Sequence, residues 1–255
     1  MTVTYVYVAM RASHLSEEAF HDYWLNVHGP LIQGMAEAFG ARRYVQCHTI
    51  ATPLNDGLWR SRGMLPPADG IAEMSWDSVE AMRAAFATPE GAEASRIAGA
   101  DERNFLDEGR SHGFMTTGNV VYDDTAARPL GPEAVRVMYV LQRRADLSRA
   151  ACQRTWLVDH GPLVNSFAPV TGLRRYVQRH TVAADAHNGL TDGRDLAPEP
   201  DGLTTAWLDS LDDLARPATP ERIQANEAMI ADERRFVDLA RSRCFVTREV
   251  VMFDR

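Results

Sequence analysis

The chain carries the same short sequence block twice, and this repeat restricts its fold more than any other feature. Residues 24–31 read WLNVHGPL, and residues 156–163 read WLVDHGPL. Residues 43–49 (RYVQCHT) and 175–181 (RYVQRHT) form a second pair with the same offset, since 156 − 24 and 175 − 43 both equal 132. Motifs that recur in one order at one spacing indicate a structural unit written twice.

We therefore expect two domains, residues 1–125 and residues 134–255. A chain of 255 residues is long enough for one large domain or two small ones, and the repeat favours two. The segment between them contains Pro129, Gly131 and Pro132, a composition that is typical of a linker.

Hydrophobic periodicity predicts the same order of elements in both halves. The first half has expected strands at 3–10, 42–50, 70–76 and 114–122, and expected helices at 17–38, 78–86 and 88–105. The second half has expected strands at 135–141, 173–182, 203–207 and 244–252, and expected helices at 147–167, 211–216 and 219–236. Gly29 and Pro30 should interrupt the first helix just after His28. Residues 52–67 and 185–200 are predicted to be loops.

The predicted fold class is α+β. Strand, helix, strand, strand, helix, strand is the ferredoxin-like arrangement, in which helices cover one face of a four-stranded antiparallel sheet. The other face of such a sheet is bare, so we expect two ferredoxin-like units to pack sheet to sheet as a pseudo-dimeric α/β barrel. The helix-covered side of each unit would then hold its own pocket.

The overall charge argues against nucleic acid and anionic membranes as partners. The chain has 27 Lys and Arg against 35 Asp and Glu, a formal net charge of −8, so no basic stripe is available to meet phosphate. A local basic patch at Arg42, Arg43, Arg174 and Arg175 is the alternative, although paired arginines at strand starts are usually solvated. We expect a small molecule to be the partner.

The chain is also expected to reside in the cytoplasm. No apolar run approaches the roughly 20 residues that cross a bilayer, and residues 1–5 do not resemble a secretory leader. Cys47, Cys152 and Cys244 are odd in number, have no CxxC spacing and occupy different places in the two halves. They therefore indicate neither a disulfide framework nor a thiolate metal site, and we expect reduced thiols.

His28 and His160 are the first candidates for catalysis. Phe20, Trp24 and His28 follow one another at steps of four on one helical face, and His160 follows Trp156 in the same way. An imidazole on an apolar face is desolvated, which lowers its pKa and favours the neutral form that can act as a base. The alternative is a buried histidine that bonds a backbone carbonyl and only supports the helix interruption.

A polar row on the second strand of each unit provides further candidates: Tyr44, Gln46 and His48 in the first half, and Tyr176, Gln178 and His180 in the second. Alternate residues of a strand share one face. Three polar side chains on that face are unusual unless it lines a wet cavity or an interface. A phenol, an amide and an imidazole could bind and polarise a carbonyl oxygen. Alternatively, the two rows meet across the seam between the sheets.

Asp101 and Asp232 begin a third shared block, DExxFxD. A carboxylate at the end of a helix opposes the helix dipole and needs a partner. That partner could be the histidine, which the carboxylate would orient, or a surface arginine, which is the commoner case. We also assign substrate contacts to the shared aromatic and amide side chains Trp24, Trp156, Gln46, Gln178, Trp76, Trp207, Phe105 and Phe236. Of these, Trp76 and Trp207 would wall either the pocket or the core.

No motif indicates a metal or an organic cofactor. His28, His48 and Asp101 could in principle form a site of two histidines and one carboxylate, but neither HxH nor HxxxH spacing supports it. The sequence also lacks GxGxxG, phosphate-loop and GxSxG patterns, so we expect neither a dinucleotide nor a serine nucleophile.

Taken together, the repeated blocks resemble the EthD-domain family of the dimeric α/β-barrel superfamily. The blocks around His28 and Tyr44, an Asp-Gly pair (Asp69 and Asp201 in the two halves) and DExxFxD occur in the same order in each half. They cover nearly the whole chain except the linker and the loops after the second strands. The resemblance implies the barrel fold and places the family signature on His28, His160, Tyr44, Tyr176, His48, His180, Asp101 and Asp232.

Two departures from the repeat suggest that the two pockets are not equally active. Arg179 stands where the first half has Cys47, and the helix before Pro220 is shorter than its counterpart.

The resemblance also bounds the function. The EthD family is named after an ether-degradation gene cluster and carries a general oxidoreductase label. Relatives in the superfamily include cofactor-free monooxygenases, polyketide cyclases, decarboxylases, lactone isomerases and haem-binding enzymes, and fold alone does not choose among them.

Our leading hypothesis is a cofactor-independent acid–base enzyme that cyclises, dehydrates or decarboxylates a small apolar carbonyl or phenolic compound. His28 and His160 would remove a proton, Tyr44 and His48 would bind the oxyanion, and Asp101 would orient the imidazole. The alternatives are a cofactor-free monooxygenase or other EthD oxidoreductase, a haem protein, and a non-catalytic protein that binds a hydrophobic ligand. Whether the fused pair assembles further is left open.

Overall fold

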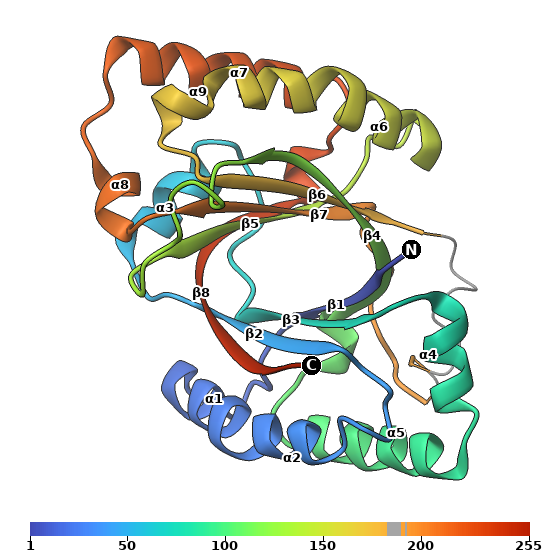
Figure 1. The fold of residues 1–255 in the computed structure, drawn as a ribbon. Helices are drawn as coiled ribbons and strands as arrows, with labels where there is room; N and C mark the ends of the chain where they lie inside the picture. The colour runs from blue at the N-terminus through green and yellow to red at the C-terminus, as the bar shows by residue number, and fades with distance from the viewer. Residues whose placement is uncertain (183–189, 192) are drawn as a thin grey trace.

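A closed eight-stranded barrel forms the centre of the computed structural model, which describes residues 1–182, 190–191 and 193–255 (Figure 1). The strands follow the order β1-β3-β2-β8-β5-β7-β6-β4 around the ring, and neighbouring strands are antiparallel. In the first half they are β1 (Val3–Ala9), β2 (Arg43–Thr49), β3 (Gly70–Trp76) and β4 (His112–Asp123). In the second half they are β5 (Val135–Leu141), β6 (Arg175–Thr181), β7 (Gly202–Leu208) and β8 (Arg243–Asp254). All eight strands expected from periodicity are therefore present.

The two sheets are joined along their edges as well as facing one another. Each half contributes a run of four strands to the ring, β4-β1-β3-β2 and β8-β5-β7-β6. The runs meet where β2 pairs with β8 and where β4 pairs with β6. This explains why β4 and β8 are the longest strands: β4, for example, pairs with β1 up to Thr116 and with β6 from Thr116 onward. Closure pairs the strand edges that a separate sheet would leave open.

Helices cover the barrel on two opposite sides (Figure 1). Below it in that view lie α1 (Glu17–Tyr23), α2 (Gly29–Gly34) and α5 (Pro89–Glu102), and α4 (Val79–Phe86) lies at the lower right. Above it lie α6 (Arg149–Thr155), α7 (Gly161–Thr171) and α9 (Pro220–Glu233). No helix among the described residues is long and apolar enough to span a membrane.

A π-helical turn interrupts the first long helix of each unit. The predicted single helix 17–38 is instead α1, a π turn (Trp24–His28) and α2, which ends at Gly34. The second unit has the same turn at Trp156–His160. Pro30 has no N–H to continue the ladder, and the Gly29 N–H reaches back five residues to the Trp24 carbonyl. The helix therefore restarts directly after the histidine, as expected from Gly29 and Pro30.

The side chains of Gln46 and Gln178 hold these turns in place. Nε2 of Gln46 donates to the Trp24 carbonyl at 2.9 Å, and Nε2 of Gln178 donates to the Trp156 carbonyl at 2.9 Å. The polar row on the second strand thus faces the helices. The alternative of a seam between the sheets is wrong for these residues, because the intervening Val45 and Cys47 point into the barrel with Val6, Phe114 and Phe245.

The loop predicted at 52–67 is wrong in one respect, because it contains α3 (Pro53–Arg60). Thr52 caps this helix by accepting a hydrogen bond from the Leu54 N–H, and Pro53 occupies the first turn, where a missing N–H has no cost. The helix packs on the second unit, beside α8 (Leu211–Ala215) (Figure 1). The other predicted loop, 185–200, lies partly outside the described residues.

Candidate functional site

Each unit contains a buried pair of one histidine and one aspartate. Nδ1 of His28 lies 2.8 Å from Oδ2 of Asp101, and Nδ1 of His160 lies 2.9 Å from Oδ2 of Asp232. The histidines end the π turns, and the aspartates lie in the last turn of α5 and of α9. Of the two partners weighed for the aspartates, the histidine is therefore present in both units.

This geometry determines which ring nitrogen is free. A carboxylate can only accept, so Nδ1 carries the proton and Nε2 presents its lone pair. Among the described residues, no group forms a hydrogen bond with Nε2 of His160. Burial lowers the pKa of His160 below its usual 6.5, against the raising influence of Asp232, so the ring is neutral and basic near pH 7.

The aspartates differ in the partner of their second oxygen. Oδ1 of Asp101 accepts from the Tyr23 hydroxyl at 2.7 Å, whereas Oδ1 of Asp232 accepts from Nη1 of Arg235 at 2.5 Å. The hydrogen bond from His28 is the largest influence that lowers the pKa of Asp101, and it outweighs the raising effect of burial. Asp232 has an arginine in addition to a histidine, so both predicted kinds of partner are found there.

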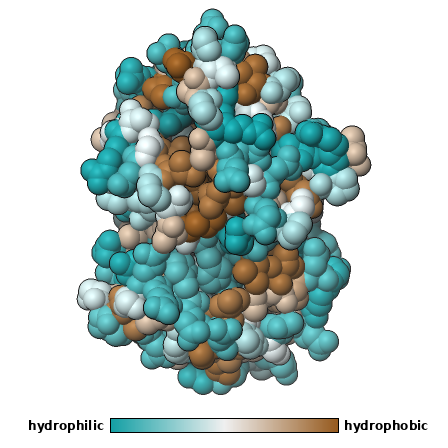
Figure 2. Space-filling model, turned by 90° about the vertical axis from the view of Figure 1, so that its left-hand side faces the viewer, coloured by the Kyte–Doolittle hydropathy of each residue, from teal (hydrophilic) through white to brown (hydrophobic). Residues whose placement is uncertain are grey.

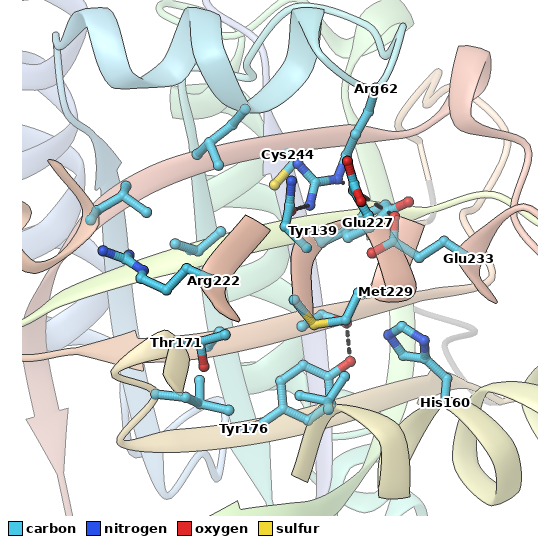
Figure 3. Close-up of a pocket in the computed structure, with 18 of the residues that line it drawn as sticks. Arg62, Tyr139, His160, Thr171, Tyr176, Arg222, Glu227, Met229, Glu233 and Cys244 are labelled. Atoms are coloured by element: carbon cyan, nitrogen blue, oxygen red, sulfur yellow. Dashed lines mark hydrogen bonds and ion pairs between the residues drawn. The ribbon is translucent and has the colours of Figure 1, made fainter. Parts of the chain in front are cut away.

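The second unit has a cavity of about 450 Å³ beside its histidine (Figure 3). His160, Tyr176, Phe236 and Trp156 form part of its wall. The Phe236 ring meets the imidazole edge-on, with 5.5 Å between ring centroids. Burial raises the pKa of Tyr176, so its hydroxyl stays protonated and can donate. The size and apolar lining are those of a small-molecule site.

One end of this cavity opens on the face that carries α3 and α8. Ile223 of α9, Leu58 of α3 and Leu214 of α8 lie there, and Ile223 is 46% exposed. Figure 2 shows hydrophobic side chains gathered in the upper half of that face, over the second unit. The lining of the cavity therefore reaches the protein surface at Ile223.

The first unit has only a cavity of about 70 Å³ beside His28. Three positions explain most of the difference. Tyr5, Phe39 and Met74 fill the first cavity, and the residues 132 positions later, Val137, Thr171 and Ala206, line the second. Phe86 of α4 also lines the small cavity, whereas the shortened α8 brings Leu214 and Arg216 to the large one. The two pockets therefore differ in size, through the residues that line them and through the shortened helix, whereas Cys47 and Arg179 line neither. That the two pockets differ in activity stays a prediction.

The predicted site residues Tyr44 and Tyr176 line the two cavities, but His48 and His180 do not. Each of these histidines packs on a tryptophan, His48 on Trp24 and His180 on Trp156, with ring centroids 4.5 and 4.7 Å apart. Nε2 of His48 bonds Oε1 of Gln46 at 3.0 Å, and Nε2 of His180 bonds Oε1 of Gln178 at 3.2 Å. They orient the glutamines that hold the π turns, so their predicted contact with an oxyanion has no support in the geometry.

Of the other predicted substrate contacts, some lie next to the cavity histidines and others lie away from the cavities. Phe105 packs on His28 at 4.9 Å, as Phe236 does on His160. Trp76 lies in the core, where its Nε1 donates to the Phe39 carbonyl, and Trp207 lies under the guanidinium groups of Arg136 and Arg175. Neither tryptophan is among the described residues that line a cavity next to a histidine.

The predicted alternative of a basic patch does not hold for its four arginines. Each is ion-paired with a nearby carboxylate: Arg42 with Asp77, Arg43 with Glu249 and Asp254, Arg174 with Asp124 and Asp209, and Arg175 with Asp123. In the described part of the chain, no three His, Cys, Asp or Glu side chains gather closely enough to share a metal ion.

Two arginines were not identified from the sequence, and each of them lines the cavity of the unit to which it does not belong. Arg62, which follows α3, lines the cavity of the second unit and is ion-paired with Glu233. Arg194 lines the cavity of the first unit and bonds Glu102. Arg62 and Arg194 are separated by the repeat offset of 132, within Arg-x₃-Pro-x₂-Asp-Gly in both halves. Extending the comparison of the halves into the loops would have found them.

Comparisons with known proteins agree with the repeat. The family model described as EthD domain matches residues 12–109 and 144–240. The comparison with curated proteins returned no match. Among solved structures, an anthrone oxidase-like protein is similar over 99% of this chain and 94% of its own, with 11% identity and a TM-score of 0.57.

Two further solved structures span one unit each. An EthD-family protein from Bacillus halodurans covers 45% of this chain and 96% of its own, with 19% identity and a TM-score of 0.32. A dimeric protein of ferredoxin-like fold from Bacteroides fragilis covers 45% of this chain and 94% of its own, with 10% identity and a TM-score of 0.30.

Proposed function

The chain belongs to the EthD domain family, and we propose that it is a cofactor-independent oxidoreductase whose second unit starts the reaction by removing a proton with His160. The single observation that carries this proposal is the His160–Asp232 pair, with its free Nε2 at the wall of an apolar cavity of about 450 Å³. A neutral imidazole oriented by a carboxylate is a general base matched to neutral pH.

The substrate class follows from the cavity wall. Its surface is largely aliphatic and aromatic, with polar groups at only a few points, which suits a flat aromatic ketone or phenol. His160 would take a proton from a carbon next to the carbonyl or ring. The Tyr176 hydroxyl would donate to the oxygen on which negative charge develops.

The carbanion formed in this way can be oxidised by molecular oxygen. The carbon gains a bond to oxygen, the carbanion supplies the electrons, and loss of water gives a ketone, so that R₂CH₂ + O₂ yields R₂C=O + H₂O. The structural similarity to an anthrone oxidase-like protein supports oxidation as the reaction. No finding supports the cyclisation, dehydration or decarboxylation that we placed first from the sequence.

Alanine substitution of the two histidines tests the proposal. With anthrone as the probe, His160→Ala should lower oxygen uptake by about 100-fold or more, because the base is lost. His28→Ala is the matched control and should change uptake by less than about 3-fold, because His28 adjoins a cavity of only about 70 Å³. Undiminished uptake by the His160→Ala variant would falsify the assignment.

A further inference from the structure

The cavity of the second unit contains a second group of polar side chains. These side chains have no role in the proposed proton transfer. Arg62, Tyr139 and Glu233 line it together (Figure 3). They come from three separate elements: the turn after α3, strand β5 and the last residue of α9. Glu233 is 6% exposed and Tyr139 is 8% exposed. Such a convergence of buried polar groups in an apolar cavity usually fixes the orientation of a ligand.

Three polar atoms of this cluster lack hydrogen-bond partners among the described residues: Nε of Arg62, Oε2 of Glu233 and the Tyr139 hydroxyl. Nε of Arg62 and Oε2 of Glu233 are 3.5 Å apart, close enough for an ion pair but longer than a normal hydrogen bond. Nη2 of Arg62 is held by Oδ1 of Asn226 at 2.9 Å. Buried polar atoms in this state are costly unless a ligand satisfies them.

The first unit shows the same pair in a closed form. There Nε and Nη2 of Arg194 donate to the two carboxylate oxygens of Glu102, at 2.5 and 3.1 Å. Arg194 lines the cavity of about 70 Å³ beside His28 and also a neighbouring pocket of about 430 Å³ whose wall does not include His28. The arginine and glutamate are therefore satisfied by each other in the first unit, whereas in the second unit the facing atoms are 3.5 Å apart, beyond normal hydrogen-bond length.

We propose that Arg62, Tyr139 and Glu233 form a subsite for a hydroxyl group of the substrate, separate from the atom that His160 deprotonates. One hydroxyl can donate to Oε2 of Glu233 and accept from Nε of Arg62 or from Tyr139, so it supplies what the cluster lacks. A carbonyl group of the ligand could not donate a hydrogen bond to Glu233. A carboxylate group of the ligand would be repelled by the negative charge of Glu233. The substrate class is thus narrowed to hydroxylated aromatic compounds of two or three fused rings.

The state of Glu233 supports this role. Burial raises the pKa of Glu233 to about 7, with a further raising influence from Asp232 and against the lowering influences of Arg62 and of the nearby Tyr139 hydroxyl. A hydroxyl that donates to the carboxylate favours its charged form and lowers that pKa. Binding near pH 7 should therefore release a fraction of a proton, which a contact elsewhere in the cavity would not do. This inference rests on the proposed function only in taking the cavity beside His160 as the substrate site.

Calorimetry with 2,7-dihydroxynaphthalene and 2-naphthol tests the subsite in the full chain. We expect the diol to bind about 10-fold or more tightly than the mono-ol, because only the diol has one hydroxyl for the cluster and another for the Tyr176 hydroxyl at the same time. Diol binding at pH 7 in two buffers of different ionisation enthalpy should show proton release. Glu233→Gln should abolish that release, because an amide does not titrate.

The double variant Arg62→Met with Glu233→Met removes both charges together, so neither is left buried and unpaired. It should reduce the preference for the diol to less than about 3-fold. The matched control, Arg194→Met with Glu102→Met, should keep the full preference. Thermal melting verifies that each variant is folded.

Equal affinities in the unchanged protein, or a preference that survives in the double variant, would overturn the subsite. These measurements need no turnover, so their outcome is independent of the oxidase assignment. Conversely, a retained diol preference together with full oxygen uptake in His160→Ala would overturn only the proposed function.

Discussion

At the scale of single residues, one hydrogen bond decides whether His160 can act as a base. Asp232 accepts from Nδ1 at 2.9 Å and so leaves Nε2 free toward the cavity. An asparagine in its place could donate to Nδ1 and shift the proton to Nε2. We therefore predict that Asp232→Asn lowers kcat by about 100-fold or more while the protein remains folded. Asp101→Asn is the control in steady-state assays, and an equal loss there would contradict the unequal roles of the two units.

The pH dependence of the reaction should report the same residue. The pKa of His160 lies below 6.5 because burial outweighs the influence of Asp232. The neutral ring is the base, so with anthrone, which has no hydroxyl group to donate to Glu233, kcat/KM should fall as the pH drops through the lowered pKa of His160. Glu233 also faces the cavity and titrates near pH 7. The acidic limb must therefore persist in Glu233→Gln, and a limb that disappears in that variant would point to Glu233 instead.

The residues of the site were only partly predictable from the sequence. The His–Asp pairs could be predicted because both members lie in repeated blocks whose chemistry is complementary. His48 and His180 were assigned to the pocket because strand alternation gives the face of a residue but not what covers it, and here the tryptophans cover it. Arg62 was not predicted because it lies in a loop, where hydrophobic periodicity does not indicate the direction of a side chain.

At the scale of elements, a glycine at the start of β7 determines the position of the second π turn. A Cβ at Gly202 would lie 2.5 Å from Cζ3 of Trp156 and would also crowd the Arg179 carbonyl. Trp156 begins the turn that ends at His160. We predict that Gly202→Ala destabilises the protein by about 1–3 kcal/mol in urea unfolding, through overpacking, and lowers activity.

Gly161 provides the comparison for that measurement. Its nearest neighbour for an added Cβ is Cγ1 of Val121 at 3.4 Å, an ordinary contact, and it lies at the start of α7. Gly161→Ala should therefore change stability by less than about 1 kcal/mol. If both alanines have the same effect, the contact with Trp156 does not limit packing at this point.

The elements themselves were predicted better than their ends. Strands and helices follow from periodicity, and the helix interruption follows from Gly29 and Pro30. α3 was missed because its sequence, rich in Pro, Asn, Asp and Gly, resembles a loop, and its capping by Thr52 and its packing on the other unit stabilise it. In such short helices, tertiary contacts contribute more to stability than the intrinsic helix propensity of the residues.

At the scale of the whole molecule, the duplicated fold has a large cavity beside His160 and a small one beside His28. Thr171 and Ala206 keep the second cavity open where the first unit has Phe39 and Met74. We predict that Thr171→Phe with Ala206→Met fills this space and weakens ligand binding by about 100-fold or more, while the His160–Asp232 pair is unchanged. Filling an existing void should leave the melting temperature equal or higher. Binding that persists in calorimetry would show that the ligand site lies elsewhere.

The sequence predicted the number of units and their internal order, because both follow from the repeat. It did not predict that β2 and β4 would continue across to β8 and β6, since strand pairing between units depends on register rather than on composition. It also did not predict the exchange of arginines between the units.

That exchange has a consequence for how the two halves can change over time. The half of the gene that encodes His160 does not encode Arg62, which lines the same cavity. Substitutions around α3 can therefore alter which compound is accepted without disturbing the codons for the base and its aspartate. Duplication has in this way placed one member of the proposed subsite in the first half of the chain, while Tyr139, Glu233 and the proposed base lie in the second half, so that this one contact can change independently.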